Sequence, residues 1–337
     1  MITKEQFEKL IDKKLIEENG KLVYNGNLDL SFRKDITELP ENLKVLGYLY
    51  LCGSGVTKLP KGLDVEKWLC ISLTAIEELP EDTKFGSNLY IEGMKKPFSF
   101  PKIVNVDGHF ECVNTTIKRM PEEIYTEKSC DFSFSMFDNY PKVMELVSSL
   151  LLCNTPITEL PEGLKEVYGK LDISNTKVSK LNENLVVYDE LNLSYTPIEK
   201  LSKGLIVGSE LNLCYTNLKD YSNLHKVCTR FRVTEGKYNE IKGTLAKHSK
   251  VEVYNGILVT FEPNYKGAYL FENENGKYIN ADYSLGKIVE QKGNVYHIQI
   301  EDWTDITYLV TDGEGHWSHR DTLEKAKDNL LYKISKG

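Results

Sequence analysis

The amino-acid sequence predicts a solenoid of short parallel β-strands, preceded by a capping helix and followed by a small α+β domain. Three observations support this fold class. An apolar pattern recurs every 20 or 21 residues between Leu28 and Phe261, prolines recur at one position of that pattern, and the period is lost after Phe261. Internal repeats with a period of about 20 to 50 residues are typical of solenoids.

The repeat follows the template Leu-x-Leu-x-x-Thr-x-Ile-x-x-Leu, which is clearest in the segments that begin at Leu171 and Leu191. Its first apolar position occurs twelve times, at Leu28, Leu49, Leu69, Leu89, Phe110, Cys130, Leu150, Leu171, Leu191, Leu211, Phe231 and Val251. A second apolar position follows two residues later, from Leu30 to Val253. Because alternate side chains of a strand point to opposite faces, each Leu-x-Leu is expected to be a strand with two core residues. We therefore predict twelve repeats with parallel strands.

Two further columns describe the rest of each repeat. Small hydroxyl residues such as Thr74, Thr155 and Thr176 stand five places after the first apolar position. Buried hydroxyls need partners, so we expect this column to bond the backbone where the chain leaves the sheet. Prolines occupy a later column, at Pro40, Pro60, Pro80, Pro101, Pro121, Pro141 and Pro161. Proline disrupts helix interiors, so the return segments are predicted to be extended or polyproline-like.

Solenoid ends expose core and sheet edges, so capping modules are expected at both. Residues 1–27 are predicted to form an N-terminal helical cap, because Thr3 and Gln6 make a capping-box pair ahead of an apolar stripe at helical spacing. The solenoid occupies residues 28–261. Residues 262–337 are predicted to form an α+β C-terminal capping domain.

The C-terminal domain is predicted to be a β-meander that ends in a helix. Strand-like runs alternate with turn clusters, at 267–271, 277–281, 287–289, 295–300 and 307–311. Asp321 and Glu324 then form a capping-box pair. The apolar residues of the following segment lie on one predicted helical face, at Leu323, Ala326, Leu330 and Ile334.

The repeats resemble bacterial short leucine-rich repeats, which combine LxLxxNxL-type strands, a 20-residue period and an LPxxL return. Thr or Ser stands here where that family usually has Asn. The resemblance implies a leucine-rich-repeat solenoid with a parallel β-sheet on its concave face and non-helical convex returns. The segment YLVTDGEGHWSHRDTLEKAKDNLLYKI is similar to a module that follows such repeats in proteins of gut bacteria and their phages. Neither resemblance implies a particular chemistry.

Composition argues against membrane insertion, export and nucleic-acid binding. No window approaches the ~18 apolar residues of a spanning helix, and charges interrupt the N-terminal segment where a signal peptide would need an apolar run. The formal net charge is −8, whereas nucleic-acid affinity rests mainly on cations. The seven cysteines are odd in number, lack CxxC pairs and fall in repeat columns. We therefore expect reduced thiols, no disulfide and a cytoplasmic location.

The sequence does not favour catalysis, and we predict a protein that is not an enzyme and uses no metal or cofactor. The densest polar cluster is Asp312, Glu314, His316 and His319. A zinc site there is an alternative, but a Gly-rich turn and a helix cap explain the segment without metal. Bacterial effectors with similar repeats can carry a ubiquitin-ligase domain with a catalytic cysteine. Every cysteine here precedes residue 230, so the tail lacks such a nucleophile.

The outward face of the strands is the predicted binding site for a protein or peptide. The candidate partner-binding residues are Tyr48, Tyr50, Trp68, Tyr90, Phe134, Tyr195 and Tyr215. Aromatic side chains are frequent hot spots of interfaces. The neighbouring Gly53, Ser72 and Gly93 are expected to leave room for a partner's side chains. The alternative is that these rings only stack along the strands and stabilise the fold.

A second hypothesis is a structural or assembly component, such as a virion part or a homo-oligomer. The solenoid would then be a spacer, and the C-terminal domain would make the contacts. An exposed apolar face on the tail would favour this hypothesis. The oligomeric state stays open.

Overall fold

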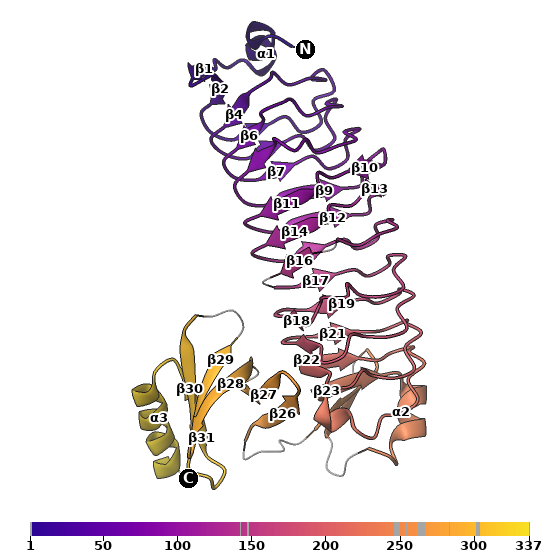
Figure 1. The fold of residues 1–337 in the computed structure, drawn as a ribbon, viewed down its shortest axis with the longest axis vertical. Coiled ribbons are helices and arrows are strands. Elements are labelled where there is room, and N and C mark those ends of the chain that lie inside the picture. Colours follow the sequence, from indigo (N-terminus) through magenta and orange to yellow (C-terminus); the bar gives the residue numbers. More distant parts are fainter. Residues whose placement is uncertain are drawn as a thin grey trace. The chain divides into compact units, whose positions relative to one another are not determined.

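The computed structural model describes residues 2–141, 143–146, 148–245, 250–253, 255–261, 267–282, 284–300 and 304–336. The chain forms two compact units, Met1–Ile157 and Thr158–Gly337. Together they contain about ten turns of β-solenoid with parallel strands. The second unit also contains an antiparallel sheet with a helix on it (Figure 1). The predicted domain junction at 261/262 adjoins residues 262–266, which lie outside the described residues.

The N-terminal cap begins with helix α1 (Lys4–Ile11). The predicted capping box is confirmed, because the Thr3 hydroxyl accepts from the Gln6 backbone N–H and the Gln6 side chain accepts from the Thr3 N–H. Phe7 is fully buried. A hairpin of β1 (Ile16–Glu18) and β2 (Lys21–Tyr24) follows, and β2 pairs in parallel with β4 (Leu43–Val45), the first return strand.

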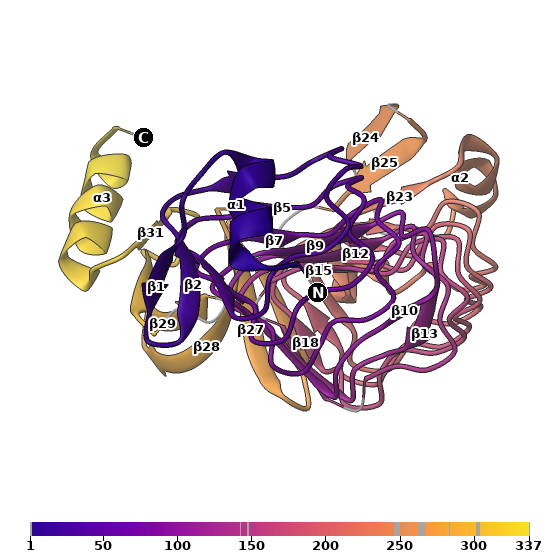
Figure 2. The same ribbon diagram turned by 90° about the horizontal axis from the view of Figure 1, so that it is seen from above.

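The first unit contains a main sheet of parallel strands, one from each Leu-x-Leu. Figure 2 shows its turns nearly superimposed when viewed along the stack. The strands are β3 (Leu28–Asp29), β5 (Leu49–Tyr50), β7 (Leu69–Cys70), β9 (Leu89–Glu92), β12 (Phe110–Val113), β15 (Cys130–Asp131) and β17 (Leu150–Leu151). Each pairs in register with the residues 20 or 21 positions later, so the first apolar column predicted from the sequence is a row of neighbours here.

The returns of the first unit are extended, as predicted, and they also form sheets that the sequence analysis missed. One sheet joins β1 and β2 to the return strands β4, β6 (Asp64–Val65) and β8 (Lys84–Phe85), and a separate sheet contains β11 (Ile103–Val106), β14 (Glu123–Thr126) and β16 (Val143–Leu146). A third pair is β10 (Phe98–Ser99) with β13 (Ile117–Arg119). Leu43 and Val45 are buried, and so are the equivalent Leu63 and Val65 of the next repeat. This recurring apolar pair is the sequence feature from which the return strands could have been predicted.

The hydroxyl column bonds the backbone as predicted. The side chains of Thr74, Thr155 and Thr176 each donate to the carbonyl three residues earlier, over 2.7, 2.6 and 2.7 Å. All three residues are buried. These bonds satisfy carbonyls at the turn where the chain leaves the strand, since a buried carbonyl without a partner would be costly.

The second unit continues the same coil pattern. Its main strands are β19 (Leu171–Asp172), β21 (Leu191–Asn192), β22 (Ile206–Asn212) and β23 (Cys228–Val233), and its return strands are β18 (Glu166–Val167) and β20 (Val186–Val187). The prediction that all returns are non-helical is wrong at the last coil. The 3-10 turn η1 (Leu224–Lys226) precedes β23, and helix α2 (Glu235–Ile241), capped by Thr234, follows it.

The predicted twelfth repeat is not a coil. Strand β24 (Lys250–Val253) runs antiparallel to β25 (Ile257–Thr260), and β25 runs antiparallel to β23. Asn255 and Gly256 both have positive φ, which is the geometry of a tight Asn-Gly hairpin turn. Val253, expected in the core, is 79% exposed. The turn reverses the chain and thereby ends the parallel stack.

The C-terminal domain is an antiparallel meander, as predicted, with six strands in sequence order. They are β26 (Tyr269–Asn273), β27 (Gly276–Ala281), β28 (Ser284–Lys292), β29 (Val295–Ile300), β30 (Ile306–Thr311) and β31 (Trp317–Arg320), followed by helix α3 (Leu323–Lys336). Strand β31 was not predicted from the sequence. The predicted Asp321 cap is also wrong: the Thr322 hydroxyl accepts from Lys325 N–H, while Asp321 pairs with Lys325.

This domain packs against the flank of the solenoid coils in its own unit (Figure 1). Tyr278 and Leu285 form one buried cluster with Val186, Tyr188 and Ile206. Polar contacts surround that cluster. The Asn273 side chain donates to the Gly204 carbonyl over 2.9 Å, the Asn280 side chain to the Gly208 carbonyl, and Lys203 pairs with Glu274 at 2.7 Å. The expected cover over Val251 and Val253 is absent among the described residues, since both are exposed.

Candidate functional site

The outward side chains of the main sheet in the first unit, together with the residue before each strand, form a surface that we call the first strand face. Tyr48 and Trp68 stand just before β5 and β7, and Leu49 N–H donates to the Trp68 carbonyl over 2.9 Å. Tyr50 lies directly opposite Cys70, which lies opposite Tyr90. The parallel register therefore brings aromatic residues of successive repeats side by side.

Three of the candidate rings contact one another. The centroids of Tyr48 and Tyr50 are 4.7 Å apart, those of Tyr48 and Trp68 are 5.7 Å apart with nearly parallel planes, and Tyr50 meets Trp68 edge-on at 6.4 Å. Trp68 remains 37% exposed. Burial raises the pKa of the Tyr50 hydroxyl, so it stays protonated. Tyr90 is next in the row, and its hydroxyl accepts from the Asn88 side chain over 2.6 Å.

The other three candidate residues lie in a different column. Phe134, Tyr195 and Tyr215 each stand three residues after the end of their strand and have φ of 59°, 58° and 60°. Tyr195 and Tyr215 stack in the second unit with centroids 4.4 Å apart, and they are 57% and 62% exposed. The left-handed conformation favours Gly or Asn, so a bulky residue there is an outlier. The structure thus joins Tyr48, Tyr50, Trp68 and Tyr90 into one row and assigns the other three to the turn column.

The expected room beside the rings is filled by the protein itself. A side chain at Gly53 would lie 2.9 Å from the Phe32 ring, and one at Gly93 would lie 2.8 Å from Leu73 Cδ2. Ser72 is buried and accepts from Glu92 N–H over 3.0 Å. Gly53 and Gly93 therefore accommodate Phe32 and Leu73 of the preceding coils rather than a partner. The accessible part of the face is the ring row and the polar residues beside it.

Carboxylates continue the aromatic row. Glu111 lies opposite Tyr90 on one side and Asp131 on the other, while Glu92 lies opposite Val113 on the same pair of strands. Burial raises the pKa of the half-buried Glu111 carboxyl, and the charges of Asp131 and Glu92 raise it further, although His109 opposes this. Like charges directly opposite each other on neighbouring strands are destabilising. This acidic row was not among the features predicted from the sequence.

The corresponding strand face of the second unit is electrically balanced. Lys170 lies 3.3 Å from Asp172 and 3.4 Å from Glu190. Arg232 bonds Glu210 through two nitrogens, at 2.6 and 3.1 Å. By contrast, the stretches 27–31, 48–52, 68–72, 88–92, 109–113, 129–133 and 149–153 of the first unit contain four acids and no lysine or arginine. The two faces share a backbone geometry and differ in charge.

The cysteines are all free thiols. Cys112 and Cys130 are completely buried in the core, and burial raises the pKa of both thiols well above the ordinary range. Cys70 and Cys214, which lie outside the two inward columns, are also buried. A protonated, inaccessible thiol is a poor nucleophile.

The Asp312 cluster forms a turn. The Asp312 carboxylate accepts from the backbone N–H of Glu314 and of His316 and lies 2.6 Å from His316 Nδ1. His319 Nε2 instead contacts the Thr307 hydroxyl at 2.8 Å. Within the described residues, no three His, Cys, Asp or Glu side chains are grouped as metal ligands would be. These hydrogen bonds within the turn explain why polar residues cluster in this segment.

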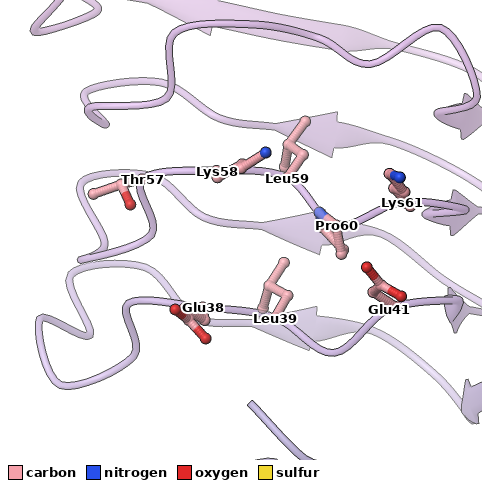
Figure 3. Close-up of a pocket in the computed structure, with 8 residues that line it drawn as sticks. All are labelled: Glu38, Leu39, Glu41, Thr57, Lys58, Leu59, Pro60 and Lys61. Atoms are coloured by element: carbon pink, nitrogen blue, oxygen red, sulfur yellow. The ribbon is translucent and has the colours of Figure 1, made fainter. Parts of the chain in front are cut away.

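A shallow hollow lies on the return side of the first unit, away from the strand face (Figure 3). It is lined by two consecutive LP returns: Glu38, Leu39 and Glu41 on one, and Thr57, Lys58, Leu59, Pro60 and Lys61 on the next. Charges of opposite sign face each other across it. This arrangement resembles the groove between any two exposed coils and concentrates no unusual chemistry.

None of the family models, characterised proteins or solved structures with which the chain was compared matches it. No helix among the described residues is long and apolar enough to cross a membrane.

Proposed function

We propose that the protein is a non-enzymatic binding module whose first strand face recognises a protein or peptide. The observation that carries the proposal is the contacting trio Tyr48, Tyr50 and Trp68, with Trp68 exposed outside the core. Rigid aromatic side chains lose little entropy when a partner immobilises them, and they dominate the energetics of many interfaces. The alternative of rings that only stabilise the strands predicts a stability effect instead.

We further infer that the solenoid is of the bacterial or phage leucine-rich-repeat type and works in a reducing cytoplasm. The 20-residue register of the strands and the LPxxL returns support the repeat type. Seven free thiols distributed over separate coils support the reducing compartment.

The experiment compares wild-type protein with Trp68→Ala as bait in a pull-down, followed by titration of the recovered partner in purified form. We expect Trp68→Ala to weaken binding by about 2 kcal/mol, or roughly 30-fold, with little change in melting temperature. Lys58→Ala serves as a control at an exposed residue on the return side of the same unit (Figure 3). Unchanged affinity together with a lowered melting temperature would assign the trio to fold stability.

A second candidate function has its own observation. Helix α3 buries Ala326 and Leu330 but exposes Leu331 and Tyr332, and Ile334, predicted on the buried face, is 41% exposed. This apolar strip supports an assembly component that makes its contacts through the C-terminal domain. Leu331→Glu would then abolish self-association in sedimentation or partner capture, whereas Trp68→Ala would leave both intact.

A further inference from the structure

The aromatic row and the acidic row of the first strand face are continuous. In the direction across the strands the directly opposed residues run Asp29, Tyr50, Cys70, Tyr90, Glu111 and Asp131. Glu111 and Asp131 form no ion pair with a lysine or arginine among the described residues. A ligand that contacts Trp68 and lies across the strands therefore meets unneutralised carboxylates next.

The second unit shows how this backbone accommodates strand-face acids when they serve only the fold. Asp172, Glu190 and Glu210 each lie beside Lys170 or Arg232. In the first unit, a lysine at the residue before each strand, equivalent to Lys170, would neutralise the charges of Glu111 and Asp131 in the same way. Those positions carry His109 and Ser129, which bond each other. Neither residue is a lysine or arginine, whereas the second unit has Lys170 at the same template position.

We propose that the first strand face recognises a cationic peptide segment, in which one side chain stacks on the Tyr48, Tyr50 and Trp68 rings and a lysine or arginine binds Glu111 and Asp131. This inference rests on the proposed function and specifies its partner. Arginine and lysine are attracted to aromatic faces as well as to carboxylates, so both parts of the surface favour the same partner charge. The Glu111 and Asp131 repulsion is relieved when the cation binds.

The strand spacing sets the pattern of the segment. Trp68 precedes β7, and Asp131 lies on β15, three strands further along. Three steps of ~4.8 Å span about 14 Å, which an extended peptide at ~3.3 Å per residue covers in about four residues. Residues four apart in an extended peptide point to the same side. The expected motif is thus an aromatic or cationic residue followed or preceded by a cation about four positions away.

The test is selection of a phage-displayed random heptapeptide library on the full-length protein, with sequencing of the recovered peptides. The charge variant is Glu111→Gln with Asp131→Asn, and the aromatic variant is Trp68→Ala. The matched control is Glu41→Gln with Glu81→Gln, which makes the same charge change at exposed return residues of the same unit. Synthetic versions of the best peptides are then titrated at low and high salt.

We expect wild type and the Glu41 and Glu81 control to enrich Lys and Arg, with the spacing above. The charge variant should lose that enrichment and bind the selected peptides about tenfold more weakly at low salt, with a smaller difference at high salt. Peptides without Lys or Arg that need Trp68 but bind the charge variant normally would overturn the cationic inference and leave the proposed function standing. Equal recovery of the same peptides by wild type, the charge variant and the aromatic variant would overturn both the cationic inference and the proposed function.

Discussion

At the scale of single residues, the turn column after each strand shows how the repeat tolerates substitution. Its members have positive φ from Phe32 through Gly53 and Asn114 to Tyr215. Their backbone N–H groups donate to the next coil, as Phe32 does to the Cys52 carbonyl over 2.8 Å. The coil imposes the left-handed conformation, so even a phenylalanine adopts it. Gly and Asn are the residues that do so at least cost.

The carboxyl of Glu111 leads to a prediction about pH. Its pKa is raised in the folded protein, so the folded state binds this proton more tightly than the unfolded state does. Its contribution to stability is therefore greatest at low pH and is lost as pH rises through the folded pKa. Glu111→Gln should remove that loss, so the stability of the variant relative to wild type should increase as pH rises from the unfolded pKa of a glutamate, about 4.3, through the raised folded pKa.

Thermal melts of both proteins across that range measure the effect. The informative quantity is the difference in melting temperature between the two proteins, because other carboxyls change stability with pH in the opposite direction. Lys14 lowers the pKa of Glu8, for example. A difference in melting temperature that does not change with pH would contradict the raised pKa of Glu111.

At the scale of elements, the hydroxyl column is what allows a strand of two residues to end inside an apolar stack. Thr176 donates to the Ile173 carbonyl and is buried. Thr176→Val keeps the shape and leaves that carbonyl without its partner, which should cost about 1 to 3 kcal/mol in the free energy of unfolding. Ser179→Ala, at an exposed position of the same coil, is the control. Chemical denaturation of the pair measures the difference, and equal midpoints would refute the role of the column.

At the scale of the whole molecule, the C-terminal domain stabilises its unit from the flank rather than from the end of the stack. Removing residues 267–337 would uncover the cluster of Val186, Tyr188 and Ile206. We expect the shortened protein to aggregate or to lose cooperative unfolding, because this apolar surface would meet water. A monomer with an unchanged melting temperature, observed by light scattering and calorimetry, would rule out that role.

A milder change tests the same contact in the intact chain. A side chain at Gly208 would lie 2.0 Å from the Tyr188 carbonyl oxygen and 2.8 Å from Leu285 Cβ, whereas Gly163 has nothing within 4 Å. Gly208→Ala should therefore lower the melting temperature much more than Gly163→Ala does. Equal effects of the two substitutions would contradict close packing of Gly208 against the Tyr188 carbonyl and Leu285.

The repeat period by itself determined the strands, the inward pairs and the hydroxyl column, and the local spacing of Thr3 and Gln6 determined the N-terminal capping box. These features depend on residues a few positions apart or one period apart, and stacking makes such residues neighbours in every coil. The acidic row was also readable, because Glu111 and Asp131 occupy equivalent positions of adjacent repeats.

Only the tertiary structure decided which side chains fill the spaces between coils and where the aperiodic parts dock. The Phe32 ring packs against Gly53, so the space expected beside this glycine is filled by a side chain of the preceding coil. Asn255 and Gly256 turn the twelfth apolar pair into a hairpin strand, although its spacing matches the template. Tyr278 packs against Val186 and Tyr188 on the flank of the coils. Such contacts join residues with no fixed separation in the chain, so periodicity carries no information about them.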